Sequence, residues 1–180
     1  DKSLMIARGI TERQFFLSLF AKDQSHSRGR QMSAHLSDPM LNIMSLVGPV
    51  GNNALQAVGV ATVIKNKKSN PLVLCSVGDG TSQQGEVLEA IAHAVRDNLP
   101  VLFVIEDNHW AISTKTFGKT FYNTPDGDAD AFYGIPIVRV DGRNAEETFD
   151  TFGKVTAKIR ADRKPAIVVF NVKRLNSHTN

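Results

Sequence analysis

Residues 72–108 read LVLCSVGDGTSQQGEVLEAIAHAVRDNLPVLFVIEDN, and they predict a strand, a helix and a second strand. The apolar runs at 72–77 and 101–106 are continuous rather than alternating, which is typical of strands buried on both faces of a sheet. Between them, large apolar residues recur every four positions, as on one face of a helix over 84–97 that ends before Pro100. This order predicts parallel strands joined by a crossover helix.

The rest of the chain continues the alternation of strands and helices. Apolar runs at 135–140 and 166–172 predict two more strands, and a helical repeat covers 144–161. Two further helices are predicted upstream, over 11–21 and 53–64. Strands that alternate with helices predict an α/β fold with a mostly parallel sheet flanked by helices.

Composition and charge narrow the class of protein. The chain has 180 residues, 42% of them hydrophobic, which suits a sizeable core, so we expect a single domain over 1–180. The net charge of +3 arises from 21 basic and 18 acidic residues that are scattered along the chain, so nucleic acid is not an expected partner. No apolar run approaches the roughly 18 residues of a membrane span, so a membrane is not expected as a partner either.

The beginning of the chain and its cysteine content suggest its context. The sequence opens in helical rhythm without an initiating Met, so we expect it to be a piece of a longer protein. Its one cysteine, Cys75, excludes a disulfide within these residues and a Cys-based metal site. This cysteine usage fits a reducing compartment, and we expect the cytoplasm, or the mitochondrial matrix in a eukaryote.

Polar motifs follow the first two predicted strands. The triplet GDG at 78–80 follows the first strand, and the Asp-Asn pair at 107–108 follows the second. Ligands of parallel sheets bind outside the carboxyl ends of the strands, so we expect Asp79 and Asn108 to converge there. The GDG triplet alone favours a structural turn. The TSQQGE stretch after it, however, brings amides and hydroxyls to a helix N-terminus, where phosphate binds.

A phosphate beside Asp79 would meet a like charge, and a divalent cation would remove this conflict. Mg²⁺ binds carboxylate, amide carbonyl and phosphate oxygens, and Asp79 and Asn108 supply the first two kinds. The chain has neither a GxGxxG fingerprint after a strand nor a Walker A motif. The residues therefore predict a diphosphate held through a metal ion rather than a nucleotide held by glycines alone.

Taken together, the motifs resemble the α subunit of the E1 component of 2-oxo acid dehydrogenases, a family that depends on thiamine diphosphate. The resemblance covers nearly the whole chain, so a thiamine diphosphate-binding fold is implied. The motifs that carry it are GDGTSQQGEVLEAIAHA at 78–94, LPVLFVIEDNHWAIST at 99–114, VDG at 140–142, R-x-x-x-H at 174–178, GRQMSAH at 29–35 and GPVGNNALQAVGVA at 48–61.

The resemblance implies which residues bind the cofactor and its metal. Mg²⁺ would be held by the Asp79 carboxylate, the Asn108 side-chain oxygen and the Trp110 main-chain carbonyl. Contacts with thiamine diphosphate would come from Gly48, Val50, Gly78, Asp79, Gly80, Thr81, Asn108 and His178.

The implied contacts fall on different parts of the cofactor. Gly48 and Val50 would lie along the aminopyrimidine ring, whereas Gly80 and Thr81 would touch the diphosphate. His178 would lie near the reactive end, and it is the implied catalytic residue, since histidine titrates near neutral pH and can transfer protons.

The resemblance also implies an activity and partners. The activity is oxidative decarboxylation of a 2-oxo acid, either pyruvate or a branched-chain 2-oxo acid, with transfer of the acyl group to the lipoyl group of a separate E2 protein. In this family the glutamate that activates the cofactor comes from the β part. We therefore expect an E1 β subunit or a fused β domain as partner, and assembly as a heterotetramer.

Self-association is expected for a further reason. The helix predicted over 53–64 carries the small residues Ala54, Ala57 and Ala61, which suit a close helix contact between subunits.

Two other interpretations stay open. The chain could belong to another thiamine diphosphate enzyme, such as a transketolase-like protein, or it could be a non-catalytic relative that serves as an assembly scaffold. Intact Asp79, Asn108 and His178 favour a catalytic protein. The chain also departs from the family pattern: Asp107 stands where the family usually has asparagine, and Glu106 where some members have arginine.

Two polar segments, 113–134 and 174–180, show neither a helical nor a strand period. A connection as long as the first is uncommon unless it is functional. In the family the corresponding loops frame the cofactor, so we expect both to be mobile without it and to become ordered around it.

Overall fold

The computed structural model describes residues 2–33, 35–44 and 48–178, and it groups the chain into two compact units, residues 1–49 and 50–180. The α/β fold lies in the second unit, so the single domain expected over 1–180 stays a prediction for the chain as a whole. Among the helices of the described residues, none combines the length and the apolar character needed to cross a bilayer.

Within the described residues, the second unit forms a five-stranded sheet. Its order is β1 (Val73–Gly78), β2 (Val101–Asp107), β9 (Ala166–Asn171), β8 (Ile135–Asp141) and β7 (Ala131–Phe132). The four long strands are parallel and coincide with the four predicted apolar runs, which confirms the mostly parallel sheet. The short β7 runs antiparallel to β8 and was not predicted, because two residues show no period. The register aligns Gly78 with Glu106 and Asp107 with Asn171, so the carboxyl ends of β1, β2 and β9 share one edge.

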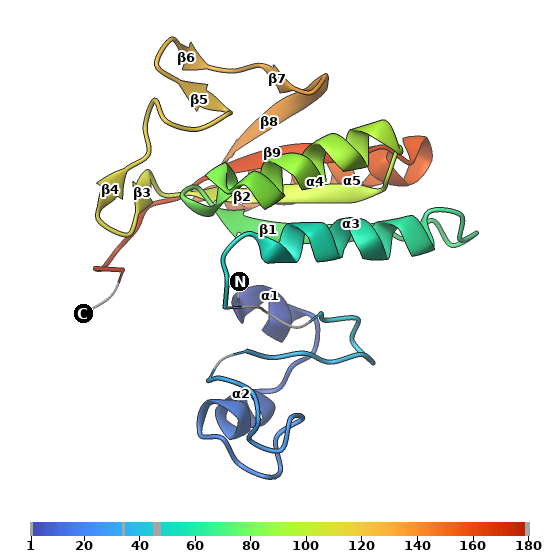
Figure 1. Ribbon diagram of the computed structural model, residues 1–180, viewed down its shortest axis with the longest axis vertical. Helices are drawn as coiled ribbons and strands as arrows, with labels where there is room; N and C mark the ends of the chain where they lie inside the picture. Colours follow the sequence, from blue (N-terminus) through green and yellow to red (C-terminus); the bar gives the residue numbers. More distant parts are fainter. Residues whose placement is uncertain (1, 34, 45–47, 179–180) are drawn as a thin grey trace. The chain divides into compact units, whose positions relative to one another are not determined.

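Helices cover both faces of this sheet (Figure 1). α3 (Asn52–Ile64) and α4 (Gly85–Arg96) pack on one face, and α5 (Ala145–Asp162) packs on the other. Successive residues of β2 alternate between the two hydrophobic clusters: Phe103 belongs to the cluster under α3 and α4, and Val104 to the cluster under α5. Because both faces exclude water, the positions along the strand are apolar without alternation, which explains the continuous runs in the sequence.

The small residues of α3 face the core of their own unit. Ala54 and Ala61 have no exposed surface and Ala57 is 7% exposed, and all three belong to the cluster with α4 and β1. The interpretation of this stripe as a contact between subunits is therefore wrong: the small side chains allow α3 to pack closely on its own sheet and on α4. Self-association stays a prediction without this support.

The connection between β2 and β8 is built from short antiparallel pairs rather than from a helix. β3 (Trp110–Ala111) pairs with β4 (Thr114–Lys115), and β5 (Asn123–Thr124) pairs with β6 (Gly127–Asp128). Tyr122 anchors the connection in the core under α3 and α4, where it is 1% exposed. Whether this connection orders further around a ligand stays a prediction.

The first unit contains two short helices, α1 (Lys2–Ala7) and α2 (Glu12–Leu19). Thr11 caps α2 in a reciprocal arrangement with Gln14, which satisfies amide groups at the start of the helix. A small separate cluster of buried residues holds this unit together, and it consists of Met5, Ile10 and Leu36.

Candidate functional site

Asp79 follows β1 and is 2% exposed. Its carboxylate Oδ2 accepts a hydrogen bond from the Thr116 hydroxyl at 2.6 Å, and its main-chain oxygen accepts one from the Ser82 hydroxyl at 2.6 Å. Across residues 2–33, 35–44 and 48–178, no lysine, arginine or histidine forms an ion pair with this carboxylate. Buried carboxylates are usually paired with a cation or bound to a metal, so Asp79 is a candidate for binding a positive ligand.

Gly80 packs closely against Ala111 in the β3–β4 hairpin. A Cβ atom at position 80 would lie 2.4 Å from Ala111 Cβ, which is far inside contact distance. Glycine is therefore required here so that the hairpin can approach the turn after β1. Gly78 differs, because a Cβ atom placed at position 78 would meet nothing within 4 Å, so its environment imposes no such requirement.

The predicted helix N-terminus after GDG consists of a short 3-10 helix, η1 (Thr81–Gln83), followed by α4. Ser82 is completely buried within it and commits its hydroxyl to the Asp79 main-chain oxygen. Thr81 is half-buried at the first position of η1. The hydroxyl of Ser82 thus shapes the turn around Asp79, and it is not a free group for a ligand.

Asp107 ends β2 and is a second buried carboxylate, 5% exposed. Its Oδ1 accepts a hydrogen bond from the His109 amide at 2.8 Å and lies 3.1 Å from His109 Nδ1. Burial raises the pKa of Asp107, and the nearby Asp79 carboxylate raises it further, whereas His109 opposes this shift. The two carboxylates are therefore close enough for their charges to interact.

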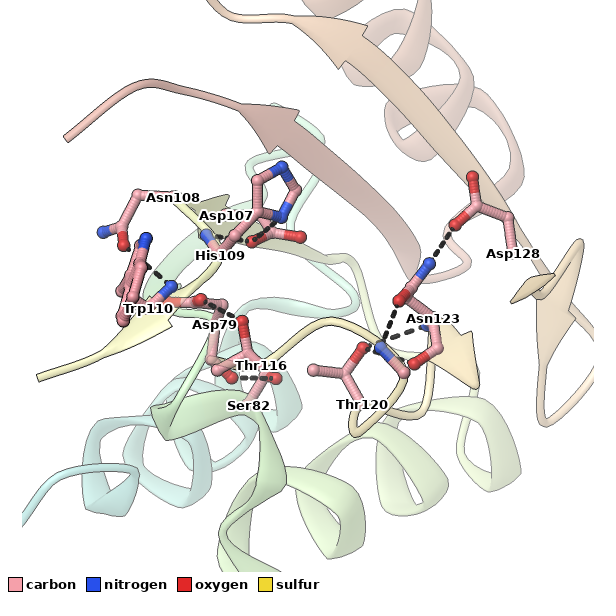
Figure 2. Close-up of polar contacts among 11 residues, drawn as sticks. Asp79, Ser82, Asp107, Asn108, His109, Trp110, Thr116, Thr120, Asn123 and Asp128 are labelled. Carbon is pink, nitrogen blue, oxygen red and sulfur yellow. Dashed lines mark hydrogen bonds and ion pairs between the residues drawn. The ribbon is translucent and has the colours of Figure 1, made fainter. Parts of the chain in front are cut away.

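Asn108 lies in the turn between β2 and β3, and Trp110 is the first residue of β3 (Figure 2). Asn108 Oδ1 accepts a hydrogen bond from the Trp110 amide at 3.1 Å, and both residues are half-buried. An amide oxygen has two lone pairs, so Oδ1 can accept a second bond or bind a metal. Left-handed backbone at His109 (φ 65°) bends this turn, and left-handed Ile112 (φ 56°) bends the next one, between β3 and β4. Such conformations cost about 1–3 kcal/mol in non-glycine residues and are common at functional sites.

A cavity of about 120 Å³ lies beside this turn. Its lining includes Asp107, His109, Arg139 and Asn171, together with the buried side chain of Tyr122. Burial raises the pKa of Tyr122, and the Asp107 charge adds to this effect, so the hydroxyl keeps its proton.

The structure brings together only part of the predicted set. Asp79, Asn108 and Trp110 gather at the carboxyl ends of β1 and β2 (Figure 2), and Gly80 follows Asp79 in the chain. His178 is exposed near the end of the described residues. For all of these residues, contact with a cofactor or a metal stays a prediction.

Gly48 and Val50 belong to different units, and both are exposed. Their predicted place along the cofactor ring stays a prediction as well.

Sequence reasoning missed Thr116 and Ala111, which connect the hairpin to Asp79 and Gly80. No local signal marks them, because the segment that carries Thr116 has no period. Among the described residues there is also no group of three His, Cys, Asp or Glu side chains that could hold a metal ion. Any metal here would need other oxygen donors, such as the Asn108 amide and a main-chain carbonyl.

The fold is shared with enzymes that use thiamine diphosphate. Transketolase from Leishmania mexicana superposes with a TM-score of 0.63 at 18% identity, over 93% of this chain and 26% of that chain. A putative thiamin diphosphate-dependent enzyme from Mycobacterium smegmatis superposes with a TM-score of 0.50 at 19% identity, over 75% of this chain and 26% of that chain. At these identities the likeness defines the fold alone.

Sequence comparison identifies the family. The model of the family "Dehydrogenase E1 component" matches residues 1–180, so the chain belongs to this family. The 2-oxoisovalerate dehydrogenase subunit alpha of Bacillus subtilis is 29% identical over 100% of this chain. The match covers 54% of that relative, so the chain spans about half of its length. The resemblance found in the sequence motifs is thereby confirmed.

Proposed function

We propose that this chain supplies the Mg²⁺ and diphosphate site of a thiamine diphosphate-dependent E1 component that oxidatively decarboxylates a 2-oxo acid. Family membership and the relative named as a 2-oxoisovalerate dehydrogenase alpha subunit support this activity. The substrate would be a branched-chain 2-oxo acid or pyruvate. Among the three hypotheses from the sequence, the family match favours this one over a transketolase-like enzyme or a scaffold.

The observation that carries the proposal is the burial of Asp79 without a cation. The carboxylate is 2% exposed, and its charge adds to that of the buried Asp107 nearby. His109 Nδ1 lies 3.1 Å from Asp107, so this histidine contacts the other carboxylate. A divalent cation would compensate Asp79 and would attract a diphosphate to the same point.

The residues of this chain fit a divalent cation that is bound to a diphosphate. Asp79 would bind Mg²⁺ through the carboxylate oxygen that Thr116 does not contact, and Asn108 would use the remaining lone pair of its side-chain oxygen. The Trp110 carbonyl would complete the set from this chain. Gly80 and Thr81, in the turn after β1, would lie against the diphosphate. His178 would hold or move a proton near the reacting carbon.

When bound, thiamine diphosphate would supply the electron sink for loss of CO₂. The contribution of this chain is to bind and orient the diphosphate end and to exclude water from it. The remaining groups would come from a β part, either as a separate subunit or as a fused domain, and the acyl group would pass to a lipoyl-bearing E2 protein. A reducing compartment, the cytoplasm or the mitochondrial matrix, is proposed as the location.

Calorimetry of Mg²⁺ binding in the presence of thiamine diphosphate tests the site, with the full-length protein assembled with its β part. Asp79→Asn keeps the shape of the side chain and removes its charge, and we expect at least about 100-fold weaker binding, because changes outside the ligand shell already cost 10–100-fold. Asp150→Asn is the matched control on the exposed surface of α5 and should bind as the wild type does. Equal affinities for Asp79→Asn and wild type would exclude the metal assignment.

The reaction itself is tested by CO₂ release from 2-oxo acids with an artificial electron acceptor. We expect release by the assembled wild-type protein and loss of release in Asp79→Asn. Binding of the cofactor without CO₂ release would instead support the transketolase-like or scaffold hypothesis.

A further inference from the structure

The indole of Trp110 brings together two cationic side chains from separate segments. The Arg174 guanidinium carbon lies 5.5 Å from the centre of the ring, and Lys115 Nζ lies 5.6 Å from it. Both distances fall within the roughly 6 Å range of cation–π attraction, for which tryptophan is the best ring. Within the part of the chain that the structure describes, neither cation forms an ion pair with a carboxylate. Both cations therefore contact the same indole ring.

Arg174 makes a second contact with the same hairpin. Its Nη1 donates a hydrogen bond to the Ile112 main-chain oxygen at 2.5 Å. A guanidinium suits both contacts at once, because its plane stacks on an aromatic ring while N–H groups at its edge donate. A lysine at position 174 would have a compact ammonium group, which is less suited to contacting the ring and the carbonyl at the same time.

The hairpin, together with Thr116 directly after β4, also contacts both sides of the candidate metal site. The Thr116 hydroxyl donates to Asp79 Oδ2 at 2.6 Å, and the Trp110 amide donates to Asn108 Oδ1 at 3.1 Å. Arg174 is therefore linked through Trp110 to Asn108, and through the hairpin to Asp79. The contacts join the segment after β9 to the turns after β1 and β2.

We propose that the Trp110 side chain is a positioning group that ties segment 172–178 to the candidate metal site through Arg174. The proposal rests on the proposed function for the metal. It adds a role for the indole, where the family resemblance implies one only for the main-chain carbonyl. The cation–π contact restrains Trp110 and so preorganises its main-chain carbonyl. The same contact restrains the segment that carries His178, in which residues 175–178 are exposed.

The test uses the full-length protein with its β part and four variants. Arg174→Gln removes the charge, Arg174→Lys keeps it without the planar fork, Trp110→Leu removes the ring, and Trp110→Phe keeps a smaller one. Arg160→Gln on the exposed face of α5 is the matched control for loss of an arginine charge. Hydrogen exchange of 172–178 measures the tie, and calorimetry with Mg²⁺ and thiamine diphosphate measures its effect on the metal site.

We expect exchange of 172–178 to rise about tenfold in Arg174→Gln and Trp110→Leu, the factor for loss of a partly desolvated cation–π contact. In Trp110→Phe and Arg174→Lys the exchange of 172–178 should rise about threefold, because each variant keeps part of the interaction. Mg²⁺ affinity should fall in the same order, by about threefold to tenfold. Arg160→Gln should match the wild type in both measurements.

The outcomes separate this proposal from the proposed function. Unchanged exchange in both Arg174→Gln and Trp110→Leu would overturn the tie, whether or not the wild type binds metal. Raised exchange with unchanged Mg²⁺ affinity would overturn the positioning role. A wild-type protein that binds no Mg²⁺ would overturn the proposed function itself, and the positioning role with it. Equal effects of Trp110→Phe and Trp110→Leu would show that the ring does not act through its π face.

Discussion

The ends of β1 and β2 and the β3–β4 hairpin that contacts them are ordered by different means. Asp79 and Asp107 are placed by long strands whose residues alternate between two hydrophobic clusters. The hairpin has strands of two residues and is placed by single contacts, such as the Thr116 hydroxyl on Asp79 and Ala111 against Gly80. The strand ends therefore hold the acidic groups firmly by core packing. The hairpin depends on a few local contacts, which makes it the part that a ligand can strengthen.

The largest expected effect concerns the protection of β1 from solvent, measured by the reactivity of its buried cysteine. Cys75 lies in this strand, 3% exposed, and burial raises its pKa to about 12. We expect alkylation with iodoacetamide at neutral pH to be on the order of 10³-fold slower than for a free thiol, because the thiolate is the reactive form. Since the pKa is raised, the rate should keep increasing as pH rises beyond about 8.5, where an ordinary thiol levels off.

Mass spectrometry of the Cys75 peptide gives this rate, and hydrogen exchange of 110–116 provides the comparison. We expect the hairpin amides to exchange before the thiol reacts. Alkylation as fast as that of a free thiol would show that β1 opens as easily as the hairpin, and the contrast between the two regions would be lost.

A smaller effect is expected where the two regions touch. Gly80→Ala places a Cβ 2.4 Å from Ala111 Cβ, so the hairpin must move away from the turn. We expect the free energy of unfolding to fall by about 1–3 kcal/mol, as for other overpacked contacts. Urea denaturation measures the change. Gly78→Ala, where a Cβ meets nothing within 4 Å, is the control and should stay within about 0.5 kcal/mol of the wild type.

The smallest effect is expected from the single hydrogen bond between the regions. Thr116→Val is nearly isosteric and removes the donor to Asp79 Oδ2, and we expect a loss of about 1–2 kcal/mol of unfolding free energy, because a buried acceptor is left without its partner. Thr116→Ser keeps the hydroxyl and should recover most of this loss. Thermal unfolding of the three proteins, side by side, provides the measurement. A Ser variant as unstable as the Val variant would assign the effect to packing rather than to the hydrogen bond.

Local pattern along the chain was enough to predict the strands and the helices around the sheet. A sheet covered on both faces favours apolar residues at successive positions, so β1, β2, β8 and β9 stand out as continuous runs. The same pattern predicted that Asp79 and Asn108 lie at one edge, because parallel strands end on the same side of a sheet. These features depend on neighbouring residues and on the general rules of parallel sheets, and both can be read from the amino-acid order.

Which surfaces meet, by contrast, depends on the tertiary fold. The stripe of Ala54, Ala57 and Ala61 fits a neighbouring subunit as well as its own sheet, and the fold selects the sheet. The Thr116 contact with Asp79 joins residues 37 positions apart, through a hairpin bent by left-handed residues that no sequence period marks. Arg174 meets Trp110 for the same reason, since one follows β9 and the other follows β2. Such contacts depend on how aperiodic segments are laid across strand ends, and that arrangement is set by the whole fold rather than by neighbouring residues.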